Sequence, residues 1–134
     1  MSEAASDPKV RAVFDAYPPA MREALDYVRL LILESARAAG VELIETLKWG
    51  QPAYLPARPR VGTTVRIDAV KGSPELYAVY VNCKTTLLDS YRLLYPDAFA
   101  FEVQRALIFS TAEPPPEEAL RHCLALALTY HRKR

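Results

Sequence analysis

The chain has 134 residues, of which 51% are hydrophobic and 25% charged, with 17 basic and 16 acidic side chains and a formal net charge of +1. This size and composition are typical of one domain with a packed core and exclude a disordered chain. The balanced charge lacks the basic surplus that nucleic acids and membranes attract, so we expect neither partner.

The first part of the chain predicts two helices. Residues 8–16 follow Asp7, a suitable N-cap, and begin with Pro8, which fits the first turn of a helix. Residues 19–39 place apolar side chains at steps of three and four and end before Gly40, so they predict the main core helix. We expect residues 1–7 to be a flexible N-terminus and residues 8–134 to form a single domain.

Short apolar segments predict the strands. They are residues 41–49, 53–55, 63–70, 75–82, 99–103 and 106–109. The first is ambiguous, because its apolar residues also fit one helical turn. The third alternates strictly, with Val65, Ile67 and Ala69 inward and Arg66 and Asp68 outward, as in a half-buried strand. The fourth is apolar on both faces, which is typical of a central strand.

Two further helices complete the chain. Residues 86–95 begin with Thr86 and have Asp89 at the capping-box position. Residues 116–133 carry an apolar stripe, with acids at the start and bases at the end, as the helix dipole favours. The whole order predicts an α+β fold, with a mainly antiparallel sheet of about five strands and long N-terminal and C-terminal helices packed on it.

The sequence has few residues that could bind a metal ion or act as a catalytic nucleophile. His122 and His131 lie nine residues apart on the last predicted helix, so they face opposite directions and cannot bind one metal together. The acidic residues on the predicted helix 19–39 are interspersed with arginines, so they form no acidic surface that would bind iron or calcium. No nucleophile, phosphate-loop or metalloprotease motif is present. The sequence therefore predicts no metal, no cofactor and no catalytic residue, and favours a non-enzymatic protein.

The two cysteines, Cys83 and Cys123, form no CxxC pair or disulfide framework, which favours a cytoplasmic protein with free thiols. Cys83 lies in NCKTT, where a strand ends and a helix begins. The helix start and Lys84 would both favour a thiolate, so a thiol-dependent enzyme using Cys83 is an alternative function. No histidine is near Cys83 in the sequence to act as its base.

Two polar segments predict a ligand-binding pocket. The first segment, ETLKWGQPAY, supplies Lys48, Trp49, Gln51 and Tyr54, and the second supplies Asn82, Cys83, Lys84 and Thr85 at a helix N-terminus. Free N–H groups, cations and aromatic walls would suit a small anionic or polar molecule. A structural interpretation is also open, in which Trp49 fills the core, Lys48 points to solvent and residues 50–52 form a turn.

The oligomeric state is open between monomer and homodimer. Leu126 and Tyr130 lie outside the core stripe of the last helix. They indicate either a homodimer interface or burial against the rest of the domain.

Four segments, ETLKWGQPAY, YAVYVNCKTTLLDSYRLLYPD, RALIF and LRHCLALALTYHRK, together resemble the YdhG-like family, known as domain of unknown function 1801. The resemblance covers residues 8–133, and KWGQP (Lys48–Pro52) is its most specific element. It implies a small bacterial, cytoplasmic α+β domain with helices packed on an antiparallel sheet, and no catalytic residue. Because some relatives are linked to frataxin-like iron handling, it also implies an iron chaperone as an alternative, although the mixed charges here depart from an acidic iron-binding surface.

Overall fold

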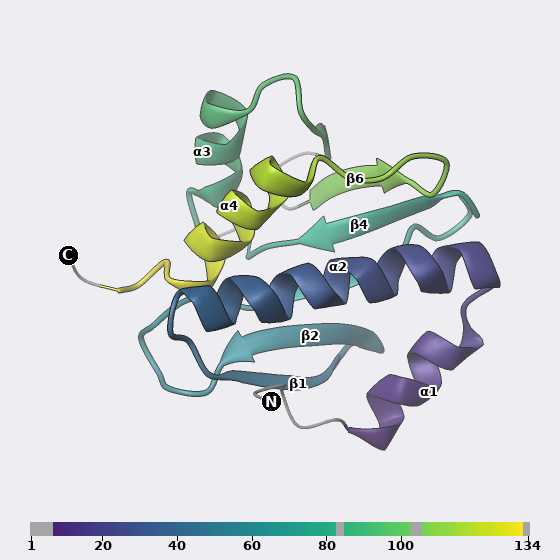
Figure 1. Ribbon diagram of the computed structural model, residues 1–134, viewed down its shortest axis with the longest axis horizontal. Helices are drawn as coiled ribbons and strands as arrows, with labels where there is room; N and C mark the ends of the chain where they lie inside the picture. The colour runs from purple at the N-terminus through teal and green to yellow at the C-terminus, as the bar shows by residue number, and fades with distance from the viewer. Residues whose placement is uncertain (1–6, 83–84, 103–105, 133–134) are drawn as a thin grey trace.

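The computed structural model describes residues 7–82, 85–102 and 106–132 and has the predicted α+β fold (Figure 1). The helices are α1 (Pro8–Ala16), α2 (Pro19–Ala38), α3 (Leu87–Leu94) and α4 (Glu117–Leu128). The strands are β1 (Leu43–Lys48), β2 (Gln51–Pro56), β3 (Val65–Ala69), β4 (Leu76–Tyr80), β5 (Ala100–Glu102) and β6 (Ala106–Ser110).

The strands form one open, antiparallel sheet in the order β1-β2-β3-β4-β6-β5. The sheet has six strands where the sequence predicted about five, because residues 51–56 form a full strand rather than the short segment 53–55. The strand predicted to be central, β4, pairs with β3 on one side and β6 on the other. The final hairpin of β5 and β6 is confirmed, and its turn at residues 103–105 lies outside the described residues.

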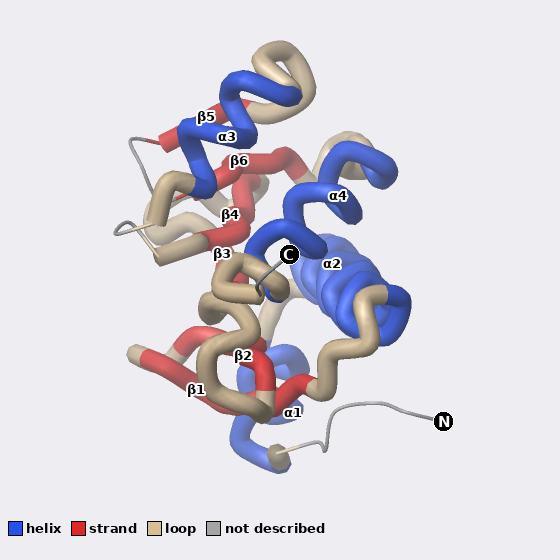
Figure 2. Tube along the Cα trace, turned by 90° about the vertical axis from the view of Figure 1, so that its left-hand side faces the viewer, coloured by secondary structure: helices blue, strands red, loops and turns tan. Residues whose placement is uncertain are grey.

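Helices α2 and α4 pack on one face of the sheet, as the edge-on view in Figure 2 shows. The buried side chains on this inner face follow the alternation of the strands. They include Tyr54, Val65, Ile67, Tyr77, Val79, Leu107 and Phe109. The opposite, outer face carries the remaining positions, and the rows defined by strand pairing place Ala53, Arg66 and Tyr80 side by side on it.

The ends of the first two helices agree with their sequence signals. Asp7 caps α1, because its Oδ1 accepts a hydrogen bond of 2.9 Å from the Lys9 N–H. Gly40 follows α2 with φ of 70°, the left-handed conformation that ends many helices. Residues 1–6 lie outside the described residues, so the flexible N-terminus stays a prediction.

The last helix is shorter than predicted. It ends at Leu128 rather than at residue 133, because the chain turns to pair with the β2–β3 connection. The His131 N–H donates to Val61 O at 2.9 Å, and the Thr63 N–H donates to Ala127 O at 2.9 Å. Gly62 is essential to this contact, since a Cβ there would lie 2.0 Å from Leu128 O.

The basic C-terminal end stabilises a different helix from the one expected. The Arg132 Nη1 donates to Ala39 O, the C-cap carbonyl of α2, at 2.9 Å. Leu126 and Tyr130, which suggested an interface, are partly buried against the core of the same chain. No helix in the described part of the chain has the length and apolarity to cross a membrane.

Candidate functional site

The KWGQP segment forms the β1–β2 hairpin, and its turn exposes the only tryptophan of the chain. Lys48 pairs with Gln51, so Trp49 and Gly50 are the two central residues of the turn. Both have positive φ, 54° and 76°, as a type I′ turn requires. The structural interpretation of Trp49 as a core residue is wrong, because its side chain is 87% exposed.

Trp49 occupies a conformation that a bulky side chain rarely adopts. Asparagine and glycine are usual at this position, and the left-handed conformation costs other residues about 1–2 kcal/mol. Burial does not offset this cost, because the indole is exposed. Strain of this kind points to a functional reason for the residue.

Arg66 of β3 lies between two aromatic rings on the outer face. Its Cζ is 5.1 Å from the centroid of the Trp49 ring and 5.1 Å from that of the Tyr80 ring. These distances are within the range of cation–π attraction. We call these three residues the outer-face stack.

A chain of hydrogen bonds holds the stack in place. Arg66 Nη1 donates to Gln51 Oε1, and Gln51 Nε2 donates to Asp68 Oδ2 at 3.2 Å. Asp68 Oδ1 also accepts a bond of 2.7 Å from the Tyr17 hydroxyl at the α1–α2 junction. Burial and this hydrogen bond to Asp68 raise the pKa of Tyr17, so its hydroxyl keeps its proton at neutral pH.

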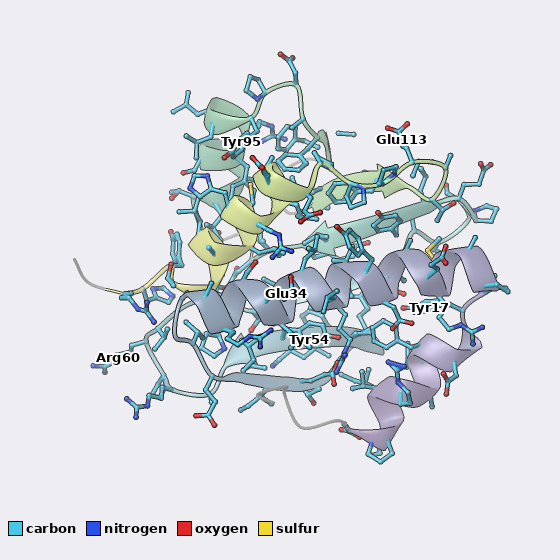
Figure 3. All side chains as sticks on the ribbon, viewed as in Figure 1. Tyr17, Glu34, Tyr54, Arg60, Tyr95 and Glu113 are labelled. Atoms are coloured by element: carbon cyan, nitrogen blue, oxygen red, sulfur yellow. The ribbon has the colours of Figure 1, made fainter. Side chains whose placement is uncertain are left out.

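Tyr54 lies away from the other hairpin residues, on the inner face. Its hydroxyl donates to Glu45 Oε2 at 2.7 Å, and Arg29 binds the same carboxylate through Nε at 2.5 Å. Burial, followed by the charge of Glu45, raises the pKa of Tyr54. We call Arg29, Glu45 and Tyr54 the inner-face cluster, and Figure 3 shows Tyr54 between α2 and β2.

The second predicted segment lies beyond the other end of β4. Gln51 contacts Asp68, which pairs with Ala78, and Asn82 follows Ala78 by four residues, a rise of about 13 Å along a strand. Figure 1 shows the same separation, because β2 begins at the right and β4 ends at the left. Gln51 and Asn82 are therefore not side by side. Cys83 and Lys84 lie outside the described residues.

The start of α3 differs from the predicted capping box. Thr86 makes no side-chain capping bond. Its N–H donates instead to the Tyr130 hydroxyl at 3.1 Å, and the Leu87 N–H is bonded to Thr85 Oγ1 at 3.4 Å. Hydrogen bonds of the Tyr130 hydroxyl with the Thr86 side chain and then with the Thr86 N–H lower the pKa of Tyr130. Two N–H groups that were expected to attract an anion thus have partners within the protein.

The other chemistry-bearing side chains show no reactive arrangement. Burial raises the pKa of Cys123 to about 12, so this thiol stays protonated and unreactive. Within residues 7–82, 85–102 and 106–132, no group of three or more His, Cys, Asp or Glu side chains is placed to hold a metal ion.

The sequence interpretation missed Arg66, Asp68 and Tyr80 as site residues. It placed Arg66 and Asp68 on the outward side of their strand, but no local sequence signal indicates that this strand pairs with the hairpin. The link depends on the pairing of Ala53 with Arg66 and of Arg66 with Tyr80. Such long-range register is set by the whole sheet.

No protein-family model, no curated protein and no solved structure matches this chain. Membership of the YdhG-like family therefore stays a prediction.

Proposed function

We propose that this protein is a non-enzymatic binding domain that holds a small, planar, anionic ligand on the outer-face stack. The observation that carries the proposal is the exposed indole of Trp49, held in a strained turn with one ring face over Arg66. Its other face is open to a planar ligand, since the side chain is 87% exposed. At protein–protein interfaces, tryptophan, tyrosine and arginine are also the residues that most often dominate the binding energy.

The charges around the stack favour an anion. Lys48 is exposed beside Trp49, and Arg66 adds a second positive charge. The nearby carboxylate of Asp68 accepts hydrogen bonds from Tyr17, Gln51 and the Ala69 N–H. A carboxylate ligand near Lys48 would therefore experience net attraction, while its planar part stacks on the indole.

The test uses Trp49 as its own reporter, because it is the single tryptophan of the chain. Benzoate is the probe and benzamide, its uncharged analogue, is the control. We expect saturable quenching of the indole fluorescence by benzoate, with a Kd of about 1 mM or tighter, and much weaker quenching by benzamide. Added salt should weaken the benzoate response, because the charges are exposed.

Two variants locate the site. Arg66→Gln and Lys48→Ala should each weaken benzoate binding several-fold. Arg58→Gln is the matched control, because Arg58 is an exposed arginine in the β2–β3 connection. Equal quenching by benzoate and benzamide, or equal benzoate binding by all three variants, would overturn the proposal.

The two alternative functions have no supporting geometry in the described residues. The iron-chaperone alternative lacks a metal-binding group of side chains there, and the thiol-enzyme alternative rests on Cys83, which is outside them. Both stay predictions from the sequence. Titration of the Cys83 thiol gives a direct test, because an apparent pKa near the free value of about 8.5 contradicts an activated thiol.

A further inference from the structure

A groove of about 420 Å³ lies between the first half of α2, β4 and the β6–α4 connection. It is far from the hairpin turn in the chain and is built from other elements. Its lining includes Ala20 and Ala24 of α2, Tyr77 of β4, and Pro114 and Pro115 of the β6–α4 connection. Its volume is within the range of pockets that bind small molecules.

Tyr77 has a buried hydroxyl without a hydrogen-bond partner. The side chain is 0% exposed, and its ring stacks on Phe109 with centroids 5.4 Å apart. Within the described residues, the only buried side-chain polar atoms that lack a partner are this hydroxyl and Ser35 Oγ. A buried polar group without a partner destabilises a protein by about 1–3 kcal/mol, so a feature of this kind needs an explanation.

The lining of the groove is acidic. Glu23 of α2 and Glu113 of the β6–α4 connection line it, and both are exposed. Figure 3 shows Glu113 on the connection that follows β6. The described residues that line the groove include these two acids and no base. Tyr27 also lines it, and its hydroxyl donates to Glu117 Oε1 at 2.5 Å. The charge of Glu117 is offset by Arg121, whose Nε lies 3.0 Å from Glu117 Oε2, so the attraction comes from Glu23 and Glu113.

We propose that this groove binds a small organic ammonium ion with an apolar body. The ammonium group is attracted by the carboxylates of Glu23 and Glu113, and it donates a hydrogen bond to the Tyr77 hydroxyl once the side chains that cover this buried oxygen move aside. The apolar body lies against the alanine and proline side chains. An ammonium ion carries only donors, and the Tyr77 oxygen and the two carboxylates can all accept. Burial raises the pKa of Tyr77 to about 12, so the phenol is neutral where alkylammonium ions are charged.

The probe is 2-phenylethylammonium, and its neutral isostere 2-phenylethanol is the control for charge. Calorimetric titration of the full chain at neutral pH should give saturable binding of the cation with a Kd of about 1 mM or tighter. The alcohol should bind at least 10-fold more weakly, because it lacks the charge that the carboxylates attract. The cation should also raise the Tm of the protein, since it binds the folded state.

Three variants assign the binding to this groove. Tyr77→Phe keeps the ring and its stacking, and should weaken binding of the cation several-fold while raising the Tm of the free protein. The double variant Glu23→Gln with Glu113→Gln should weaken binding at least 10-fold. Glu118→Gln is the matched control, since Glu118 is exposed on α4 and is not among the residues that line the groove.

Two results would overturn the proposal. The first is the absence of saturable binding by the wild-type protein. The second is binding of equal strength in the wild type, Tyr77→Phe and the double glutamate variant, which would place the cation elsewhere, such as on the exposed ring of Trp49. The indole fluorescence reports that last case directly. Benzoate binding at the hairpin should be the same in wild type and Tyr77→Phe. The proposed anion site at the hairpin and the proposed ammonium site in the groove are therefore tested independently.

Discussion

Each face of the sheet carries an arginine in contact with aromatic and polar side chains, and the two groups differ mainly in burial. In the inner-face cluster, the side chains of Arg29 and Glu45 are only 16% and 2% exposed. In the outer-face stack, the Trp49 ring that covers Arg66 is 87% exposed. Similar residues therefore fix the fold on the inner face, whereas on the outer face they leave an aromatic ring exposed, which is the surface that we propose for binding.

The hydrogen bonds show the same contrast. Arg29 binds Glu45 through two nitrogens, with Nε–Oε2 at 2.5 Å and Nη2–Oε1 at 3.2 Å, in the bidentate geometry that makes such pairs strong. Arg66 reaches Asp68 through the amide of Gln51. Direct pairing in a largely buried site makes the inner-face cluster sensitive to the loss of any member.

The largest effect should come from breaking the inner-face cluster. Glu45→Gln removes the charge that pairs with Arg29 and keeps the shape of the side chain. Leaving a buried charge without its partner typically costs about 3 kcal/mol or more, so we expect the free energy of unfolding to fall by about that amount. Urea denaturation followed by circular dichroism measures it. Glu42→Gln, at an exposed position, is the control and should change stability by less than about 0.5 kcal/mol. A loss below about 1 kcal/mol for Glu45→Gln would contradict the structural role.

A smaller loss should follow from Tyr54→Phe. The substitution removes the hydroxyl that donates to Glu45 and keeps the buried ring. A hydrogen bond to a charged acceptor contributes about 1.5–3 kcal/mol, so we expect a loss near 2 kcal/mol at neutral pH. Benzoate binding should be unchanged, because Tyr54 lies on the inner face. A matching loss of benzoate binding would mean that the two faces are coupled.

The same variant tests the pH dependence of stability. The pKa of Tyr54 is raised in the folded protein, whereas a tyrosine in the unfolded chain ionises near pH 10. Its stabilising effect is therefore complete below about pH 10 and declines above it, by about 1.4 kcal/mol per pH unit, because only the unfolded state releases the proton. The stability difference between wild type and Tyr54→Phe should shrink as the pH rises above 10, while the other buried tyrosines are common to both proteins. A difference that stays constant up to pH 11 would contradict this assignment.

Local signals predicted the elements well where the cause of the structure is local. The alternation in residues 63–70 placed Val65 and Ile67 in the core, and Asp7 capped α1 as its position indicated. The turn was predicted at residues 50–52, one residue too late, because Gln51 and Pro52 already belong to β2 and the central residues are Trp49 and Gly50. The sequence also did not reveal that Trp49 is exposed. The alternation of apolar residues 41–49 predicted a strand that continues through Trp49. In the structure Trp49 lies in the type I′ turn instead, and its indole ring is exposed.

The sites could not be predicted because their partners come from distant parts of the chain. Glu45 is buried because Arg29 lies 16 residues earlier, on a different element. The Thr86 N–H donates to the hydroxyl of Tyr130, 44 residues later, so the capping box that the local sequence predicted does not form. A single sequence records neither contact, because packing of the whole fold creates both.

On the outer face, Arg66→Gln should change stability little and binding strongly. The variant loses two cation–π contacts near the surface, each worth about 0.5 kcal/mol, so we expect a loss of roughly 1 kcal/mol in the free energy of unfolding. Urea denaturation, with Arg58→Gln as the control, measures this loss. A loss as large as that of Glu45→Gln would mean that the outer-face stack is structural, and would remove the contrast between the faces.

The smallest expected effect is an increase in the free energy of unfolding, in the variant Trp49→Asn. It separates the backbone strain at residue 49 from the contact of the indole with Arg66. Trp49→Asn places in the type I′ turn a residue that tolerates positive φ, which should recover about 1 kcal/mol of backbone strain. The loss of the Arg66 contact offsets about half of this gain, so stability should rise by about 0.5 kcal/mol. Trp49→Leu is the matched control, because it removes the ring and keeps the strain, and it should be less stable than Trp49→Asn by about 1 kcal/mol. Urea denaturation compares the three proteins, and calorimetry should show that both variants lose benzoate binding. If Trp49→Asn is less stable than the wild type, the indole stabilises the fold and the strained turn is no argument for binding.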